Sequence, residues 1–395
     1  MASEFLALAV TAFSLGLASI IALKFRIPPL IVFLLMGMIA GTYGFLQSNT
    51  IITFIGNLGS VLLLFAIGTE FSIYKLFKSG FFKEAKTALV EVGVTFFLLY
   101  LFFSLWLSIS VALILALAFS ITSTGISLKL LQELNMSKKF DIPLIIKISV
   151  IEDLLAVLMF TFISSYSLSQ GQPFNQVVES FILSIILFVM AYYAFYVFLN
   201  KFLFRYEIKE EDLLMLALGV LLLLVSIAGA LNLSTSFGAY ISGSIVSIWK
   251  DRWKSIDADL KKFSYIFISI FFLSIGLQVS LLNVDFLMLL IILPVVLVVK
   301  FAGVFAGTQV SYWSSRLSFF NSIGMLSRGE LTLVLVSAAV TSGLLPQGYL
   351  GLAALVVFLT VVATFIMLTR SVDMYTAIRI RFPKVRIGHQ ARRWH

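Results

Sequence analysis

The sequence predicts an all-α membrane protein of about 13 transmembrane helices, arranged as two inverted repeats. Three observations predict this fold class. The chain has 395 residues, of which 61% are hydrophobic and 12% charged, and its mean hydropathy is +1.08. Its apolar runs have the length, about 18–25 residues, that a helix needs to cross a bilayer. Polar breaks and glycine pairs recur along the chain at an offset of about 206 positions.

The expected spans follow one another almost from end to end. In chain order they are residues 5–23, 28–47, 51–69, 87–106, 109–134, 142–166, 175–200, 212–230, 234–249, 263–282, 285–309, 316–343 and 349–370. The first run lacks a preceding basic region and a following cleavage site, so we interpret it as a span rather than a signal peptide. The chain has no cysteine, and both histidines, His389 and His395, lie in its basic C-terminal tail. Disulfides, thiolate metal sites and intramembrane histidine chemistry are therefore excluded.

The lysines and arginines fall in alternate connections between the expected spans. The intervening loops, residues 47–50, 106–109, 167–174, 231–235 and 344–348, contain neither residue type. By the positive-inside rule this asymmetry predicts a multi-pass membrane protein with its N-terminus outside and its C-terminus in the cytoplasm. The net charge of +9 is therefore a topology signal, and nucleic-acid binding is not expected.

Three matches at nearly the same offset indicate an internal repeat. Met36–Ile39 matches Ser242–Ile245, and the Ile-Gly pair at Gly68 matches that at Gly276. The third match relates the polar breaks of the fifth and twelfth spans. An offset of seven spans inverts one copy relative to the other, which is typical of transporters with a mid-membrane site. The predicted organisation is a first repeat of six helices (1–174), a linker helix (175–200), a second repeat of six helices (201–370) and a basic cytoplasmic tail (371–395).

Ionisable residues at membrane depth are costly and are candidate functional groups. Glu152 and Asp153 stand side by side in the sixth span, where mutual repulsion and desolvation let at least one of them hold a proton near neutral pH. We interpret Asp153 as the primary ligand of a monovalent cation and Glu152 as its partner. The alternative is a structural ion pair, with Lys147 or Lys300 as the candidate charge partner. Glu91 lies about one turn inside the fourth span, where an interfacial position is an open alternative.

Two polar breaks interrupt the fifth and twelfth spans. Thr122, Ser123 and Thr124 could coordinate a hard cation through hydroxyl and freed carbonyl oxygens, or simply bond back to their own helix. Arg328 and Glu330 stand two residues apart in the second break. We expect them to neutralise each other and the half-helix dipoles, in a structural or gating role rather than as ligands.

Six stretches of the sequence resemble the cation:proton antiporter superfamily, on the branch of Kef-type potassium efflux proteins and NapA-type sodium/proton antiporters. They are Leu63–Glu70, Phe119–Gly125, Ile151–Ala156, Phe237–Gly243, Phe271–Gly276 and Ser327–Glu330. The resemblance implies crossed, discontinuous helices 5 and 12, a separate dimerisation domain that makes a homodimer, and elevator-like movement of the core in a prokaryotic plasma membrane. It also implies that Asp153 is the ion-binding aspartate.

The sequence departs from the family pattern at three points. Glu152 occupies a position where family members carry aspartate, glutamine or asparagine. Electrogenic members carry a lysine in the tenth span that pairs with this first acid, and residues 264–282 contain none, which favours electroneutral exchange. The regulatory domain of Kef-type proteins is not expected, because only a short basic tail without a Gly-rich phosphate loop follows the last span.

The function that the sequence predicts is secondary active exchange of protons for Na+ or K+, without a cofactor and without enzymatic chemistry. The alternative is a monovalent cation channel or an efflux pathway of the Kef type, although no carbonyl filter motif is visible. An intramembrane protease would need a second catalytic aspartate or a histidine within the membrane. A carrier of organic anions is disfavoured by two adjacent acids at the expected site.

Overall fold

The computed structural model describes residues 2–25, 28–46, 50–70, 82–134, 136, 140–168, 174–205, 210–231, 233–247, 254–279 and 286–381. Every regular element in these ranges is a helix. The first half of the chain forms α1 (Ala2–Phe25), α2 (Pro29–Thr42), α3 (Thr50–Glu70), α5 (Phe82–Ser104), α6 (Ile109–Ser120), α7 (Thr124–Glu133), α8 (Ile142–Leu168) and α9 (Phe174–Arg205). The second half forms α10 (Glu210–Ala230), α11 (Thr235–Ser247), α12 (Lys254–Leu277), α13 (Phe286–Tyr312), α14 (Ser315–Gly324), α15 (Glu330–Thr341) and α16 (Gly348–Arg381).

The predicted fold class is confirmed. Each predicted span contains a helix, and the fifth and twelfth spans are divided into α6/α7 and α14/α15, at the polar breaks. Six stretches of the described chain are long and apolar enough to cross a membrane. Beyond residue 370, the end of the last predicted span, α16 continues as a helix to Arg381. The rest of the predicted tail, 382–395, lies outside the described residues.

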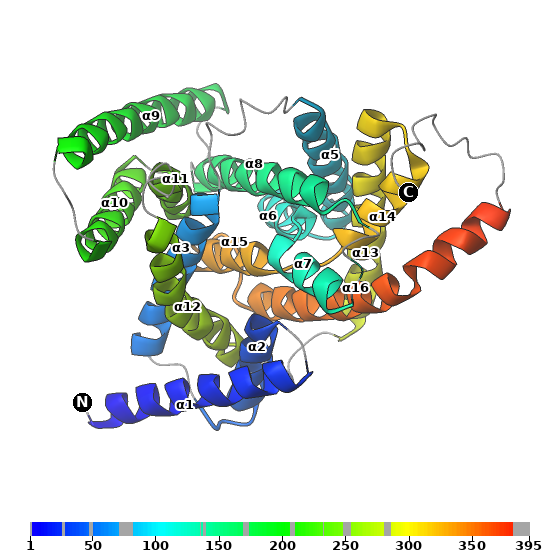
Figure 1. The fold of residues 1–395 in the computed structure, drawn as a ribbon, viewed down its shortest axis with the longest axis horizontal. Coiled ribbons are helices and arrows are strands. Elements are labelled where there is room, and N and C mark those ends of the chain that lie inside the picture. The colour runs from blue at the N-terminus through cyan, green and yellow to red at the C-terminus, as the bar shows by residue number, and fades with distance from the viewer. Residues whose placement is uncertain are drawn as a thin grey trace.

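The helices form two groups in space (Figure 1). One group consists of α1, α2, α3, α10, α11 and α12, which pack mainly on one another. The other, which we call the core bundle, consists of α5, α6, α7, α8, α13, α14, α15 and α16. The two groups touch chiefly where α8 meets α11, where α15 meets α3 and where α16 meets α12. The interrupted helices lie inside the core bundle and are flanked by its continuous helices.

Helix contacts follow the pseudo-twofold relation expected of inverted repeats. The repeat offset relates α2 to α11 and α3 to α12, and the structure packs α2 against α12 and α3 against α11. In the same way, α5 packs against its counterpart α13. The contacts of α5 with α8, and of α6 with α8, recur as α13 with α16 and α14 with α16. The boundaries of the two repeats remain a prediction.

Two glycine crossings join the repeats, and they use the residues that revealed the repeat. A Cβ atom on Gly37 would lie 2.9 Å from the Cα of Gly276, and one on Gly276 would lie 2.8 Å from the Cα of Gly37. The related pair is Gly68 and Gly243, where a Cβ on Gly243 would lie 2.9 Å from the carbonyl carbon of Gly68. The obstacles are backbone atoms, which cannot swing aside. Small residues therefore let these helices approach closely, as in other membrane helix pairs.

Gly276→Ala is expected to lower the stability of the fold by about 1–3 kcal/mol, because overpacking against backbone must push α2 and α12 apart. The matched control is Gly219→Ala in α10, where an added Cβ would meet nothing within 4 Å. Thermal unfolding in detergent, followed by size-exclusion chromatography, measures both variants. Equal melting temperatures for the two variants would contradict the close crossing.

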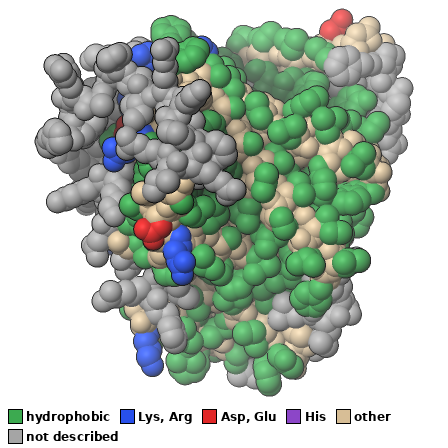
Figure 2. All heavy atoms as spheres, turned by 90° about the vertical axis from the view of Figure 1, so that its right-hand side faces the viewer, with side chains coloured by type: hydrophobic (Ala, Val, Ile, Leu, Met, Phe, Trp, Pro, Cys, Tyr) green, Lys and Arg blue, Asp and Glu red, His purple; other side chains and the backbone are tan. Residues whose placement is uncertain are grey.

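The surface suits a lipid environment. Figure 2 shows a face covered largely by hydrophobic side chains, with few charged groups among them. Large apolar residues stand out from several helices, including Phe13, Phe54, Met215 and Leu290, which are at least 69% exposed. Such a surface is unusual for a soluble protein and is expected of one surrounded by acyl chains.

Candidate functional site

The first helix break positions three polar residues in the centre of the core bundle. α6 ends at Ser120, and α7 begins at Thr124 with Ser123 as its N-cap. The Ser123 hydroxyl accepts a hydrogen bond from the backbone N–H of Ile126, 3.3 Å away. Serine and threonine favour such caps over helix interiors because their side chains compete for backbone groups. The run of Thr122, Ser123 and Thr124 therefore explains why the helix stops and restarts here.

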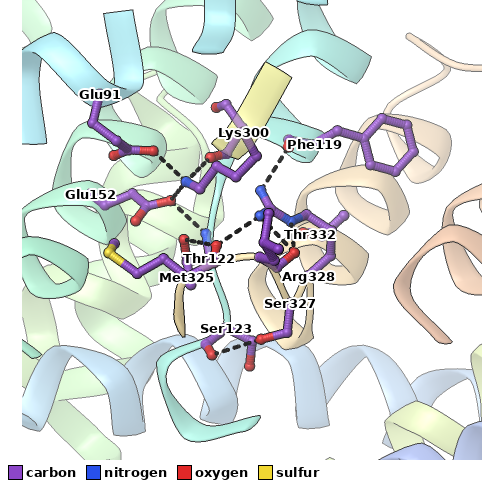
Figure 3. Close-up of polar contacts among 12 residues, drawn as sticks. Glu91, Phe119, Thr122, Ser123, Glu152, Lys300, Met325, Ser327, Arg328 and Thr332 are labelled. Carbon is purple, nitrogen blue, oxygen red and sulfur yellow. Dashed lines mark hydrogen bonds and ion pairs between the residues drawn. The ribbon is translucent and has the colours of Figure 1, made fainter. Parts of the chain in front are cut away.

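The second break lies directly against the first (Figure 3). The Ser123 N–H donates to the Ser327 carbonyl oxygen at 2.9 Å, and the Ser127 and Ser327 hydroxyls are 2.8 Å apart. The Thr122 hydroxyl donates to the carbonyl oxygen of Met325 at 3.1 Å. The Thr332 hydroxyl donates to the carbonyl oxygen of Ala118 at 2.9 Å, across the same junction. Polar groups freed by one break thus satisfy those freed by the other, as unwound backbone inside a membrane protein requires.

Arg328 serves the C-terminal ends of two half-helices. Its side chain is fully buried and donates to the carbonyl oxygens of Phe119 (2.9 Å), Met325 (3.0 Å) and Leu326 (2.9 Å). These carbonyls lie at the ends of α6 and α14, where the helix dipoles are negative. All the hydrogen bonds of the Arg328 guanidinium go to carbonyl oxygens. Arg328 therefore does not form the predicted hydrogen-bonded pair with Glu330.

Glu330 stands instead at the first position of α15, the positive end of a half-helix. Its carboxylate accepts a hydrogen bond from the Ser123 hydroxyl at 2.6 Å. Each of the two residues therefore neutralises helix dipole ends, as predicted, but the two do so at different ends and not as a pair. Arg328 lies at two carbonyl ends and Glu330 at one amide end.

Lys300 is the charge partner of Glu152. From α13 its ammonium group donates to Glu152 Oε1 at 2.7 Å, to the Ser120 carbonyl oxygen at 2.5 Å and to Glu91 Oε1 (Figure 3). All three charged side chains have no exposed surface. Three acceptors use the three donors of the ammonium group. The Thr122 N–H, 2.5 Å from the same Glu152 oxygen, completes the contact.

This arrangement bears on three open points of the sequence analysis. Glu91 is not interfacial, because it is completely buried and bonded to Lys300. Lys300 of α13, one of the two candidate charge partners, pairs with Glu152. Lys147 does not reach the acid pair, since it lies on the half-exposed surface of α8 and pairs with Glu84 at 3.0 Å.

Asp153 points in a different direction from Glu152, as the turn of a helix requires. It is 9% exposed, whereas Glu152 is 0% exposed. It lies near enough to Tyr240 of α11 for the two groups to interact electrostatically. α8 packs against α11, so Asp153 lies toward the junction between the core bundle and the other group of helices. The hydroxyls of Thr122 and Ser123 are bonded to Met325 and Glu330, within the crossing.

The sequence contains a signal that favours a buried, paired Glu91. The polar residues of α5 recur at Glu84, Thr87, Glu91 and Thr95, one face of a helix. On α13, Gly303 and Gly307 let that face approach closely, since a Cβ on Gly307 would lie 3.0 Å from the Glu91 Cβ. The pairing of Glu91 with Lys300 depends on this contact between distant segments.

Comparisons with known proteins agree with this architecture. The family model described as sodium/hydrogen exchanger, transmembrane, matches residues 9–370. A Na(+)/H(+) antiporter of Enterococcus hirae is 28% identical over 367 residues, covering 87% of this chain and 91% of that protein. The K(+)/H(+) antiporter subunit KhtU of Bacillus subtilis is 26% identical over 350 residues, covering 83% of this chain and 84% of that protein. The sodium proton antiporter MjNhaP1 of Methanocaldococcus jannaschii has the same fold, with a TM-score of 0.68, 18% identity and coverage of 95% of this chain and 98% of that one.

Proposed function

As the chain belongs to the transmembrane sodium/hydrogen exchanger family, we propose that it is a secondary active antiporter that exchanges protons for Na+ or K+ at Asp153. The observation that carries the proposal is the different placement of two adjacent carboxylates. Glu152 is held by the Lys300 ammonium and the Thr122 amide. Asp153 points in a different direction from the same helix, toward the junction between the two groups of helices.

Exchange follows from competition for one carboxylate. A proton or a cation can neutralise Asp153, but the binding of one removes the charge that attracts the other. Coordination is completed by oxygen ligands from the neighbouring break at Thr122, Ser123 and Thr124, the kind of donor that hard cations prefer. A bare carboxylate at membrane depth is costly, so the carrier crosses only with its site filled. This coupling converts two separate binding events into obligatory exchange.

The two groups of helices suit an elevator-type movement. The five charged side chains that are buried in the described structure, Glu91, Glu152, Asp153, Lys300 and Arg328, all belong to the core bundle. The bundle can therefore move as one body, carrying Asp153 past α11 and α3 of the other group. Alternating access of this kind is common in transporters built from inverted repeats. We further propose that the protein forms a homodimer, as the family resemblance implies. We also propose that its N-terminus is outside and its C-terminus in the cytoplasm, an orientation that the distribution of basic residues favours.

The direct test is transport by the purified protein in liposomes that contain a pH-sensitive dye. With an imposed proton gradient, addition of Na+ or K+ outside is expected to drive proton movement that saturates with cation concentration. Li+ and choline, tested under the same conditions, separate cation selectivity from ionic strength. Cation flux that needs no proton gradient would support the channel alternative instead. Absence of proton movement with every cation would overturn the proposal.

A further inference from the structure

Three buried acids and two buried bases form the charged centre of the core bundle. Within the described residues, Glu91, Glu152, Asp153, Lys300 and Arg328 are the charged side chains that are buried. With all five ionised, their sum is one negative charge. Uncompensated charge is strongly disfavoured in a medium of low polarity. One monovalent cation or one proton on Asp153 therefore brings the centre to neutrality.

Glu91 is the residue that makes this sum negative. It contacts neither Asp153 nor the crossed breaks, and its charged partner is the Lys300 ammonium. Glu152, Lys300 and Arg328 are the charged groups that act on it electrostatically. Without Glu91, Lys300 and Arg328 would balance Glu152 and Asp153. A bound cation would then leave an excess positive charge unless Lys300 gave up its proton.

We propose that Glu91 sets the exchange at one proton per monovalent cation, by keeping Lys300 charged throughout the cycle. Lys300 retains its contacts with Glu91 and the Ser120 carbonyl when a cation occupies Asp153, so the ammonium proton is never released. Each half-cycle carries a neutral centre across, with either one proton or one cation on Asp153. Exchange is then electroneutral, although a lysine pairs with the first acid. Glu91 acts through Lys300 and is a positioning residue rather than a ligand.

This inference rests on the proposed antiport and adds its stoichiometry. Two geometrical facts support it. Lys300 bonds both carboxylates at once rather than choosing between them, and all three side chains have no exposed surface. The second oxygens of Glu91 and Glu152 are buried and have no hydrogen-bond partner. The ammonium group is therefore the principal source of stabilisation for both acids, and its loss would leave two carboxylates unpaired.

The experiment measures transport current in proteoliposomes adsorbed on a solid-supported membrane, beside proton movement from the dye assay. The wild type is expected to move protons with no net current after a cation jump. Glu91→Gln is expected to produce current, because without Glu91 a bound cation displaces the Lys300 proton as well as the Asp153 proton, so that two protons exchange for each cation. Glu84→Gln is the matched control, since it makes the same change on α5 but pairs with Lys147 at the surface. Glu84→Gln is expected to move protons without net current, like the wild type.

A second variant keeps the test decisive where Glu91→Gln does not transport. The double variant Glu91→Gln, Lys300→Gln removes one acid and one base and restores a single negative charge. This double variant is expected to recover cation-dependent proton movement without net current. The proposal is overturned by a wild-type current that scales with cation-driven proton movement, by silent transport in Glu91→Gln, or by a double variant that stays inactive when the single variant is inactive. Wild-type protein that moves no protons with any cation would instead overturn the antiport itself.

Discussion

Asp153→Asn is expected to abolish cation-dependent proton movement. The asparagine side chain cannot take up a proton near neutral pH and has no charge to attract a cation. At an effective dielectric constant of about 20 and a separation of about 4 Å, the lost attraction is about 4 kcal/mol, roughly a thousandfold in cation affinity. The measurement is the dye assay in proteoliposomes, with the cation concentration raised to separate weak binding from absent coupling.

Glu152→Gln is the matched comparison, because it makes the same acid-to-amide change one residue earlier. Its carboxylate is held by Lys300 and the Thr122 amide, so this variant is expected to keep cation-dependent proton movement at an altered rate. Both variants must give a monodisperse elution profile before their transport is compared. If Asp153→Asn transported like the wild type while Glu152→Gln did not, the primary ligand would have to be reassigned to Glu152.

The fold could be predicted from the sequence because membrane insertion depends on local properties. Apolar length marks the spans, and breaks such as Thr122 to Thr124 reveal themselves by residue type. The repeat was visible because Gly68 and Gly276 are required by close helix crossings in both copies. The extension of α16 to Arg381 was missed because hydropathy reports the edge of the membrane, not the end of a helix.

The partners within the site could not be predicted in the same way. Lys300 and Glu91 are 209 positions apart and meet because α13 packs against α5 through small residues. Arg328 and Glu330 were expected to pair because they are close in sequence. In the structure, Arg328 lies at the carbonyl ends of two half-helices and Glu330 at the start of a third. Sequence identifies which charges are buried, whereas the tertiary arrangement decides which groups neutralise them.

Arg328 is expected to contribute more to stability than any other single side chain of the crossing. Arg328→Met keeps a long unbranched side chain but removes the hydrogen bonds to Phe119, Met325 and Leu326. Those carbonyls lie at buried helix ends, where losing a charged donor leaves both the acceptor and the dipole uncompensated. The expected loss in the free energy of unfolding is about 3–5 kcal/mol, the size found when one member of a buried charge interaction is removed.

The same substitution at an exposed arginine provides the control for Arg328→Met. Arg316 lies in the first turn of α14 and is exposed, so Arg316→Met is expected to leave the melting temperature in detergent nearly unchanged. Arg328→Lys should fall between the two, since an ammonium keeps the charge but lacks the planar fork that reaches carbonyls of two half-helices. The ranking Arg316→Met, Arg328→Lys, Arg328→Met in order of decreasing stability tests both the charge and the geometry. If Arg328→Lys were as stable as the wild type, charge alone would hold the crossing together, and the bonds that span the two breaks would be dispensable.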